Sequence, residues 1–162
     1  MRIYLVALFL LWASSIPSWA QENSNPNLYS EALFASIMQM DKSWGNMKDG
    51  DQLRTDYHHV IVEKDPVLTD ELPGSRDDYF VEYLDTQGLI ARYKGNNKQF
   101  LVFKIFPIQT KESNLRIHIL VSWFSYQKKR ALFAITDWGD VTFQFDCQTQ
   151  QFVITGVKLG GI

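Results

Sequence analysis

Two adjacent histidines, His58 and His59, lie in residues 55–64 (TDYHHVIVEK) and are the first residues whose types suggest chemistry. The β-branched centre of this segment predicts a strand, in which neighbouring side chains point to opposite faces. His58 and His59 therefore cannot bind one metal together, whereas Asp56 and His58 share a face. A carboxylate beside an imidazole holds it in one tautomer and so orients a general base. His58 is thus a candidate catalytic base, with an ordinary polar pair at a strand edge as the alternative.

A second candidate is Asp137, in a segment (residues 131–147) that alternates like a long strand. Large apolar side chains of this segment occupy one phase, the odd-numbered positions, and so share one face of the strand: Phe133, Ile135, Val141, Phe143 and Phe145. Asp137 belongs to that phase, and a bulge near Gly139 would have reversed it, so we expect Asp137 to face the interior. A buried carboxylate must be hydrogen-bonded, paired or neutral. Two interpretations stay open: a structural acceptor, or a general base in a pocket. Gly139 is expected where a helix or a ligand approaches closely.

Aromatic side chains near these candidates could wall an apolar pocket for a small molecule. The predicted ligand-binding residues are Tyr83, Trp123, Asp137 and Trp138, with Trp44 and Phe103 as further wall residues. No metal and no cofactor are expected, because His118 stands at no zinc-ligand spacing and the chain has no glycine-rich phosphate loop. The single cysteine, Cys147, continues the apolar phase and is expected to be a small buried hydrophobe.

The first twenty residues, MRIYLVALFLLWASSIPSWA, combine Arg2, an apolar run and small residues at the end. They predict a signal peptide over residues 1–20, cleaved near Ala20, and a periplasmic or extracellular protein. No later run is long and apolar enough for a membrane-spanning helix, so none is expected in the mature chain. Without Arg2 the chain keeps 15 of its 16 basic residues against 18 acidic ones, a net charge of −3. Such a charge does not predict the basic surface with which proteins bind nucleic acid.

Residues 21–27 predict a flexible tether and residues 28–162 a single domain of ordinary size. A helix should begin after Asn27 and stop at Gly45, with a buried stripe formed by Leu33, Ile37, Met40 and Trp44. Two strands should follow, near residues 55–64 and 78–85, and then a short helix over residues 86–94, capped by Asp85 or Thr86. Four antiparallel strands are predicted within residues 100–108, 115–126, 131–147 and 152–159, with a basic hairpin tip at residues 127–130.

This order predicts an α+β fold and resembles the nuclear transport factor 2-like superfamily, whose cone-shaped fold is shared with ketosteroid isomerases. The resemblance covers residues 28–159. It implies a curved antiparallel sheet of about six strands that wraps around the N-terminal helix and leaves a pocket. The stretches TDYHHVIVEK, VEYLDTQGLIARYK and VKLGGI also resemble a group of uncharacterised exported bacterial proteins, which implies no activity.

Three functions stay open at this point. The leading interpretation is an exported, non-catalytic binding or accessory protein that holds a small apolar ligand or a protein partner. The second is an isomerase- or hydrolase-type enzyme with Asp137 or His58 as general base. The third is a structural module that forms a homodimer through a sheet face containing Leu120, Phe124 and Tyr126.

Overall fold

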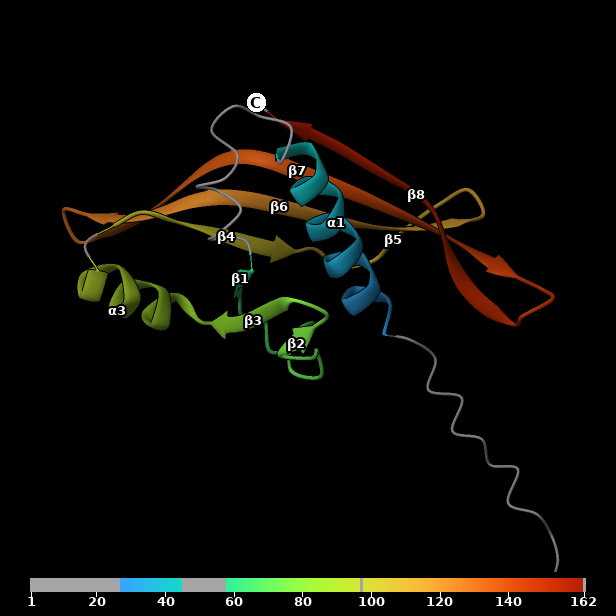
Figure 1. Ribbon diagram of the computed structural model, residues 1–162, viewed down its shortest axis with the longest axis horizontal. Helices are drawn as coiled ribbons and strands as arrows, with labels where there is room; N and C mark the ends of the chain where they lie inside the picture. Colours follow the sequence, from blue (N-terminus) through green and yellow to red (C-terminus); the bar gives the residue numbers. More distant parts are fainter. Residues whose placement is uncertain (1–26, 45–57, 97, 162) are drawn as a thin grey trace, which may run out of the picture.

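The computed structural model describes residues 27–44, 58–96 and 98–161, which form two helices and an eight-stranded sheet (Figure 1). The helices are α1 (Leu28–Trp44) and α3 (Thr86–Asn96). The strands are β1 (His59–Glu63), β2 (Ser75–Arg76), β3 (Tyr79–Leu84), β4 (Phe100–Ile105), β5 (Gln109–Lys111), β6 (Asn114–Gln127), β7 (Arg130–Asp146) and β8 (Gln151–Gly161). The predicted α+β class is confirmed. The signal peptide, most of the tether, Gly45, Asp56 and the side chain of Trp44 lie outside the described residues.

Helix α1 begins as its sequence predicts. The side chain of Asn27 accepts hydrogen bonds from the backbone N–H groups of Tyr29 (3.0 Å) and Ser30 (3.4 Å), which would otherwise have no partner in the first turn. The stripe residues Leu33, Ile37 and Met40 are almost fully buried. Helix α3 likewise begins after a cap, Asp85, whose carboxylate accepts a hydrogen bond from the backbone N–H of Gly88 at 2.7 Å.

The sheet runs in the order β2-β3-β1-β4-β6-β7-β8, with β5 paired to the first residues of β6. Strand β1 is parallel to both β3 and β4, so the expectation of a purely antiparallel sheet of six strands is wrong. Parallel strands need a crossover connection, and α3 supplies it between β3 and β4. The sheet is open rather than closed on itself.

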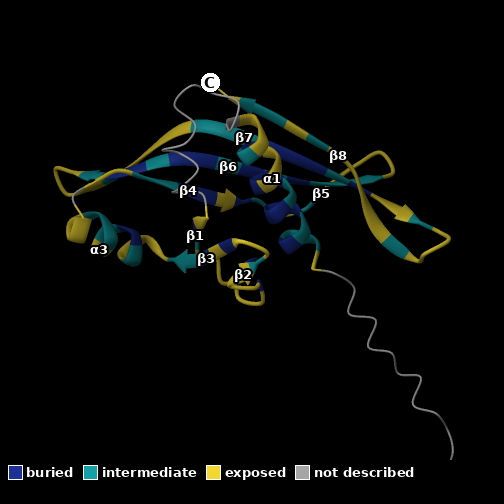
Figure 2. Ribbon diagram, in the orientation of Figure 1, coloured by how far each residue is buried: buried dark blue, intermediate teal, exposed yellow. Residues whose placement is uncertain are grey.

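Two helices cover opposite faces of this sheet, and the neighbouring residues Val102 and Phe103 of β4 point to the two sides. Phe103 joins the larger core under α1, and Val102 joins a smaller core under α3. We call these sides the α1 face and the α3 face. Helix α1 lies across β6, β7 and β8 (Figure 1). The middle of β6 and β7 is buried, while the ends of the two long hairpins are exposed (Figure 2).

A β-bulge in β7 reverses the alternation of that strand. Val121 pairs with Asp137, but the next residue of β6, Ser122, pairs with Ile135, so Thr136 is an extra residue. The hydroxyl of Thr136 donates to the carbonyl oxygen of Val121 at 3.3 Å. β8 has a similar bulge at Thr155, whose hydroxyl donates to the carbonyl oxygen of Thr142 at the same distance.

The expected single phase of residues 133–147 is therefore wrong. Phe133 and Ile135 precede the bulge, lie on the α3 face, and are 43% and 46% exposed. Asp137 follows the bulge and lies on the α1 face, as expected, although not for the expected reason. The strand ends at Asp146, and Cys147 is exposed in the following turn rather than buried.

Candidate functional site

Asp137 is half-buried on the α1 face, in a row that crosses the sheet. The paired residues of this row are Tyr83, Val62, Phe103, Val121, Asp137 and Gly161. Tyr83 and Asp137 thus share a face but are separated by three strands, roughly 19 Å along the sheet. Asp137 does not meet Tyr83 directly.

The other predicted wall residues divide between the two faces. Trp123 is half-buried on the α1 face, two residues beyond the core residue Val121. Trp138 lies on the α3 face, so the structure does not bring it together with Trp123, Tyr83 or Asp137. Tyr83 donates its hydroxyl to the carbonyl oxygen of Pro73 at 2.9 Å, and burial raises its pKa to about 12.

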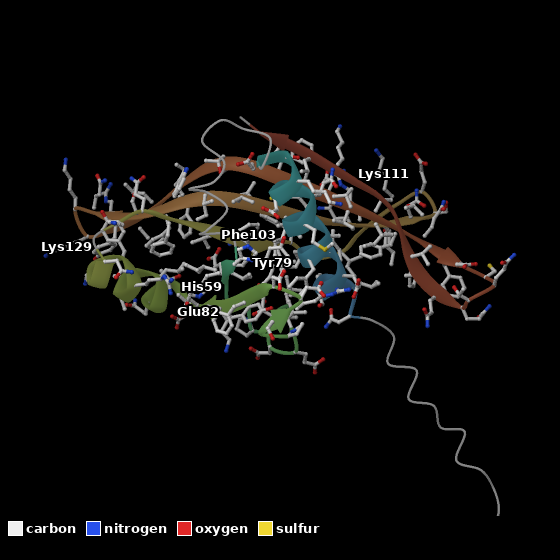
Figure 3. All side chains as sticks on the ribbon, in the orientation of Figure 1. His59, Tyr79, Glu82, Phe103, Lys111 and Lys129 are labelled. Atoms are coloured by element: carbon white, nitrogen blue, oxygen red, sulfur yellow. The ribbon has the colours of Figure 1, made fainter. Side chains whose placement is uncertain are left out.

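The two histidines point to opposite sides, as the strand geometry requires. The exposed ring of His58 stacks on Tyr79, with centroids 5.6 Å apart, and its Nδ1 lies 3.1 Å from the carbonyl oxygen of Asp78. His59 instead lies beside Glu82 (Figure 3), with Nε2 3.1 Å from Oε2, and Arg92 donates to the same oxygen at 2.5 Å. His58 is thus oriented by a backbone carbonyl within the described residues, and Asp56 lies outside them.

His58 borders a hollow of about 680 Å³ between α1 and the start of β3. The described residues that line it are Met38, Asp41, Lys42, His58, Asp77, Asp78 and Tyr79. Four of these seven residues are aspartate or lysine, and none of the seven is a predicted ligand-binding residue. Across the described ranges, no group of three or more His, Cys, Asp or Glu side chains is placed to hold a metal ion.

A more organised site, which the sequence did not reveal, lies on the α3 face of β6, β7 and β8. It consists of three rows, each given from β6 to β8: Leu120–Trp138–Gly160, His118–Asp140–Lys158 and Arg116–Thr142–Gly156. We call these nine residues the Asp140 patch. Helix α3 covers a different part of this face, over Val102 and Phe124. No helix in the described part of the chain covers the patch.

Asp140 is the centre of the patch and is only 8% exposed. Its Oδ1 lies 2.7 Å from His118 Nδ1, and its Oδ2 accepts a hydrogen bond from Arg116 Nη2. Both carboxylate oxygens are therefore satisfied, as a buried acid requires. Arg116 Nε is buried and has no hydrogen-bond partner among the described residues.

Aromatic rings fix the position of His118 and the edge of the patch. The imidazole lies between Phe106 and Trp138, with centroid separations of 5.4 Å and 6.1 Å. Lys158 Nζ lies 5.7 Å from the Trp138 ring centre. The indole of Trp138 lies flat over Gly160, where a Cβ atom would be 2.3 Å from the ring. Glycine is thus the only residue type at position 160 that leaves room for this ring.

The patch can do two kinds of chemistry. Asp140 can hold the neutral imidazole of His118 with Nδ1–H as donor, which leaves Nε2 as the proton acceptor. Alternatively, the paired carboxylate fixes a surface of cationic and aromatic side chains that contacts a partner. Arg116 favours the second, because it occupies the other carboxylate oxygen of Asp140 and adds a cationic group to the surface.

The predicted dimer surface is not available as expected. Phe124 is fully buried, with Tyr93 of α3 against its ring at 6.3 Å between centroids, and Lys94 lies over Tyr126. Only Leu120 of the three expected residues belongs to the uncovered part of the face, where it is half-buried. Neither helix in the described ranges has the length and hydropathy of a membrane span.

Comparison with known proteins adds no family to these observations, so the chemistry of the Asp140 patch rests on its contacts. No protein-family model matches the chain, and neither a curated protein nor a solved structure shows significant similarity to it.

Proposed function

We propose that the protein is an exported, non-catalytic binding protein and that a protein partner docks on the Asp140 patch. One observation carries the proposal: a buried, fully paired carboxylate organises aromatic and cationic side chains on a part of the sheet that no described helix covers. Export rests on the N-terminal sequence pattern. Small-molecule sites are usually concave, whereas this patch is a sheet surface that suits another protein.

The side chains of the patch define the partner's chemistry. Arg116, His118 and Lys158 offer cationic or hydrogen-bond-donating groups against the single carboxylate of Asp140. Trp and Arg are enriched among the residues that dominate binding energy at interfaces. We therefore expect the partner to present a carboxylate beside an apolar side chain, so that the acid meets Lys158 and the apolar group meets Trp138.

Site-specific photo-crosslinking in the exporting cell tests this proposal. A benzoylphenylalanine at Thr142, which is half-buried within the patch, should give one discrete adduct. The charge reversal Lys158→Glu in the same chain should abolish the adduct, because it repels an acidic partner. Lys111→Glu, at an exposed position on β5, is the matched control and should leave the adduct intact. An adduct that survives Lys158→Glu, or no adduct at all, contradicts the proposal.

An enzyme is the second candidate, favoured by the 2.7 Å contact between His118 Nδ1 and Asp140 Oδ1. In an isomerase- or hydrolase-type reaction, His118 Nε2 would take the proton, in the role first considered for His58 and Asp137. Panels of ester and enone substrates test this candidate. Turnover that His118→Gln abolishes, while the protein stays folded, would favour the enzyme over the binding protein.

The cone and its apolar-ligand pocket remain a further alternative, located on the α1 face. Tyr83, Trp123 and Asp137 share that face, which supports a common lining only if the sheet wraps far enough to bring its two sides together. Native mass spectrometry of the purified protein tests this alternative. A co-purified apolar molecule that Trp123→Ala releases would support it over the Asp140 patch.

A further inference from the structure

β8 is an edge strand of unusual length. It is 11 residues long and is the last strand of the sheet, and no strand in the described ranges pairs with its outer side. Alternate backbone N–H and C=O groups along that side, roughly five of each, point away from β7. Such a row of groups is a template for another strand.

β8 carries few of the usual protections of an edge strand, which are limited to the bulge at Thr155 and one charged residue. It contains no proline and no acidic residue, and its only charged residue is Lys158. The ammonium group of Lys158 lies over Trp138 of β7, so it is turned inward over the sheet rather than outward across the edge. The opposite edge is quite different, because β2 is only two residues long. Very short strands, prolines, bulges and several charged side chains are how monomeric proteins protect their edges, and β8 has only one bulge and one lysine.

Apolar side chains are exposed on both faces of the same strand. Phe152 and Ile154 lie on the α1 face at 37% and 38% exposure, and Val153 lies on the α3 face at 40%. Phe145 of β7 packs against Phe152 with ring centroids 5.3 Å apart and is itself 46% exposed. A strand added to β8 would cover apolar surface on both faces as well as the backbone groups.

We infer that two copies of this chain pair through β8, antiparallel and edge to edge, into one continuous sheet. A second copy fits because it brings an identical strand with the same open groups, and a two-fold axis satisfies both edges at once. The axis is perpendicular to the sheet, so it keeps the α1 faces of both copies on one side. This pairing surface is separate from the α3-face surface around Phe124 that the sequence suggested.

The mass of the mature protein in solution is the first test. Sedimentation equilibrium should give a dimer, and Val153→Lys should raise its dissociation constant about tenfold or more, because a lysine on the edge of each copy opposes pairing. Val67→Lys is the matched control, since Val67 is 87% exposed in a loop, and it should leave the dimer unchanged. Circular dichroism confirms that both variants fold.

A cysteine scan tests the pairing itself and does not depend on the Val153 variant. Cys147 is first replaced by serine, which its exposed position allows, and single cysteines are then placed along β8 except at Gly160. In antiparallel pairing, the residue at the two-fold axis faces its own copy within disulfide reach. Mild oxidation should therefore crosslink one or two neighbouring positions quickly and the others slowly.

Two results would overturn the inference. One is a monomer at every concentration, as expected if another segment of the same chain covers β8. The other is a dimer that neither responds to Val153→Lys nor crosslinks at a preferred position. Neither result touches the proposed docking on the Asp140 patch, whose test depends on Lys158→Glu.

Discussion

The contact between α1 and Gly139 gives the sharpest test of the packing. A Cβ atom at Gly139 would lie 2.9 Å from Ser36 Oγ and 3.4 Å from Ser36 Cβ, closer than such atoms normally approach. We therefore expect Gly139→Ala to destabilise the protein, because either the serine hydroxyl or the whole helix must move. Gly139 has this role because α1 crosses β7 at that residue.

The magnitude follows from two opposing effects. Overpacking a core typically costs about 1–3 kcal/mol. Replacing glycine by alanine in an extended backbone stabilises a protein by about 0.4–1 kcal/mol, through the lower entropy of the unfolded chain. The net loss of unfolding free energy should therefore be about 1.3 kcal/mol from the midpoints of the two ranges, and at most about 2.6 kcal/mol.

Ser36→Ala should rescue the variant. Ser36 is fully buried, and its hydroxyl has no hydrogen-bond partner in the described part of the chain. Its removal should by itself stabilise the protein by about 1 kcal/mol, since an unsatisfied buried hydroxyl carries a desolvation penalty. In the Ser36→Ala background, Gly139→Ala no longer meets Oγ and should cost almost nothing.

Urea unfolding followed by circular dichroism, at one protein concentration, measures these differences. Gly156→Ala is the matched control, because it is a strand glycine with no atom within 4 Å of its added Cβ, and it should stabilise slightly. The packing is refuted if Gly139→Ala is as stable as Gly156→Ala. It is equally refuted if Ser36→Ala gives no rescue, which would mean that α1 does not contact β7 at this residue.

Three further outcomes are expected from single side chains. Burial raises the pKa of Tyr83 to about 12, so the folded protein loses stability as the pH rises from about 10 towards that value. Tyr83→Phe should remove this loss of stability, together with the change in absorbance at 295 nm that occurs near pH 12. The pKa of Asp146 is lowered by hydrogen bonds, first from the backbone N–H of Gln148, so the stability advantage of wild type over Asp146→Asn should shrink as the pH falls below about 4. Asp140→Asn should lower the unfolding free energy by about 2 kcal/mol in urea titrations, against less than about 0.5 kcal/mol for the exposed Asp70→Asn, because of the two carboxylates only that of Asp140 is buried.

Local features of the fold were predictable because short-range rules determine them. The cap at Asn27, the cap at Asp85 and the buried stripe of α1 depend on residues within a few positions of one another. The hairpin tip at residues 127–130 was predictable for the same reason. Its turn is nevertheless unusual, since Lys128 and Lys129 adopt positive φ angles of 48° and 63° without a glycine.

The parallel pairing of β1 could not be predicted, because it depends on which distant strands meet. Residues 59–63 carry no signal that selects β3 and β4 as neighbours over an antiparallel partner. The selection comes from α3, which has to pack Leu89 against Ile61 and Val102 on one face of the sheet. This constraint joins three segments that are far apart in the chain.

The Asp140 patch was missed because of one residue. Counting back from the turn pair Gln127 and Arg130, whose numbers add to 257, pairs Asp140 with Ile117 instead of His118. The extra residue Thr136 raises the total to 258 and puts Asp140 opposite His118. Arg116 and His118 are two positions apart and therefore predict a polar face on β6. The bulge determines which acidic residue of β7 lies beside them, and the sequence does not reveal the bulge.

The bulge at Thr136 also sets which changes in chain length this protein can tolerate. Deleting Thr136 would leave Asp137 opposite Val121 and every later side chain of β7 on its present face, whereas deleting a residue after Thr136 would exchange the two faces of the strand beyond the deletion. Residues could be gained or lost in the turns at the ends of the long hairpins without such an exchange. Related chains should therefore vary in length at those turns and hold a constant residue count from Asp137 to the end of β7.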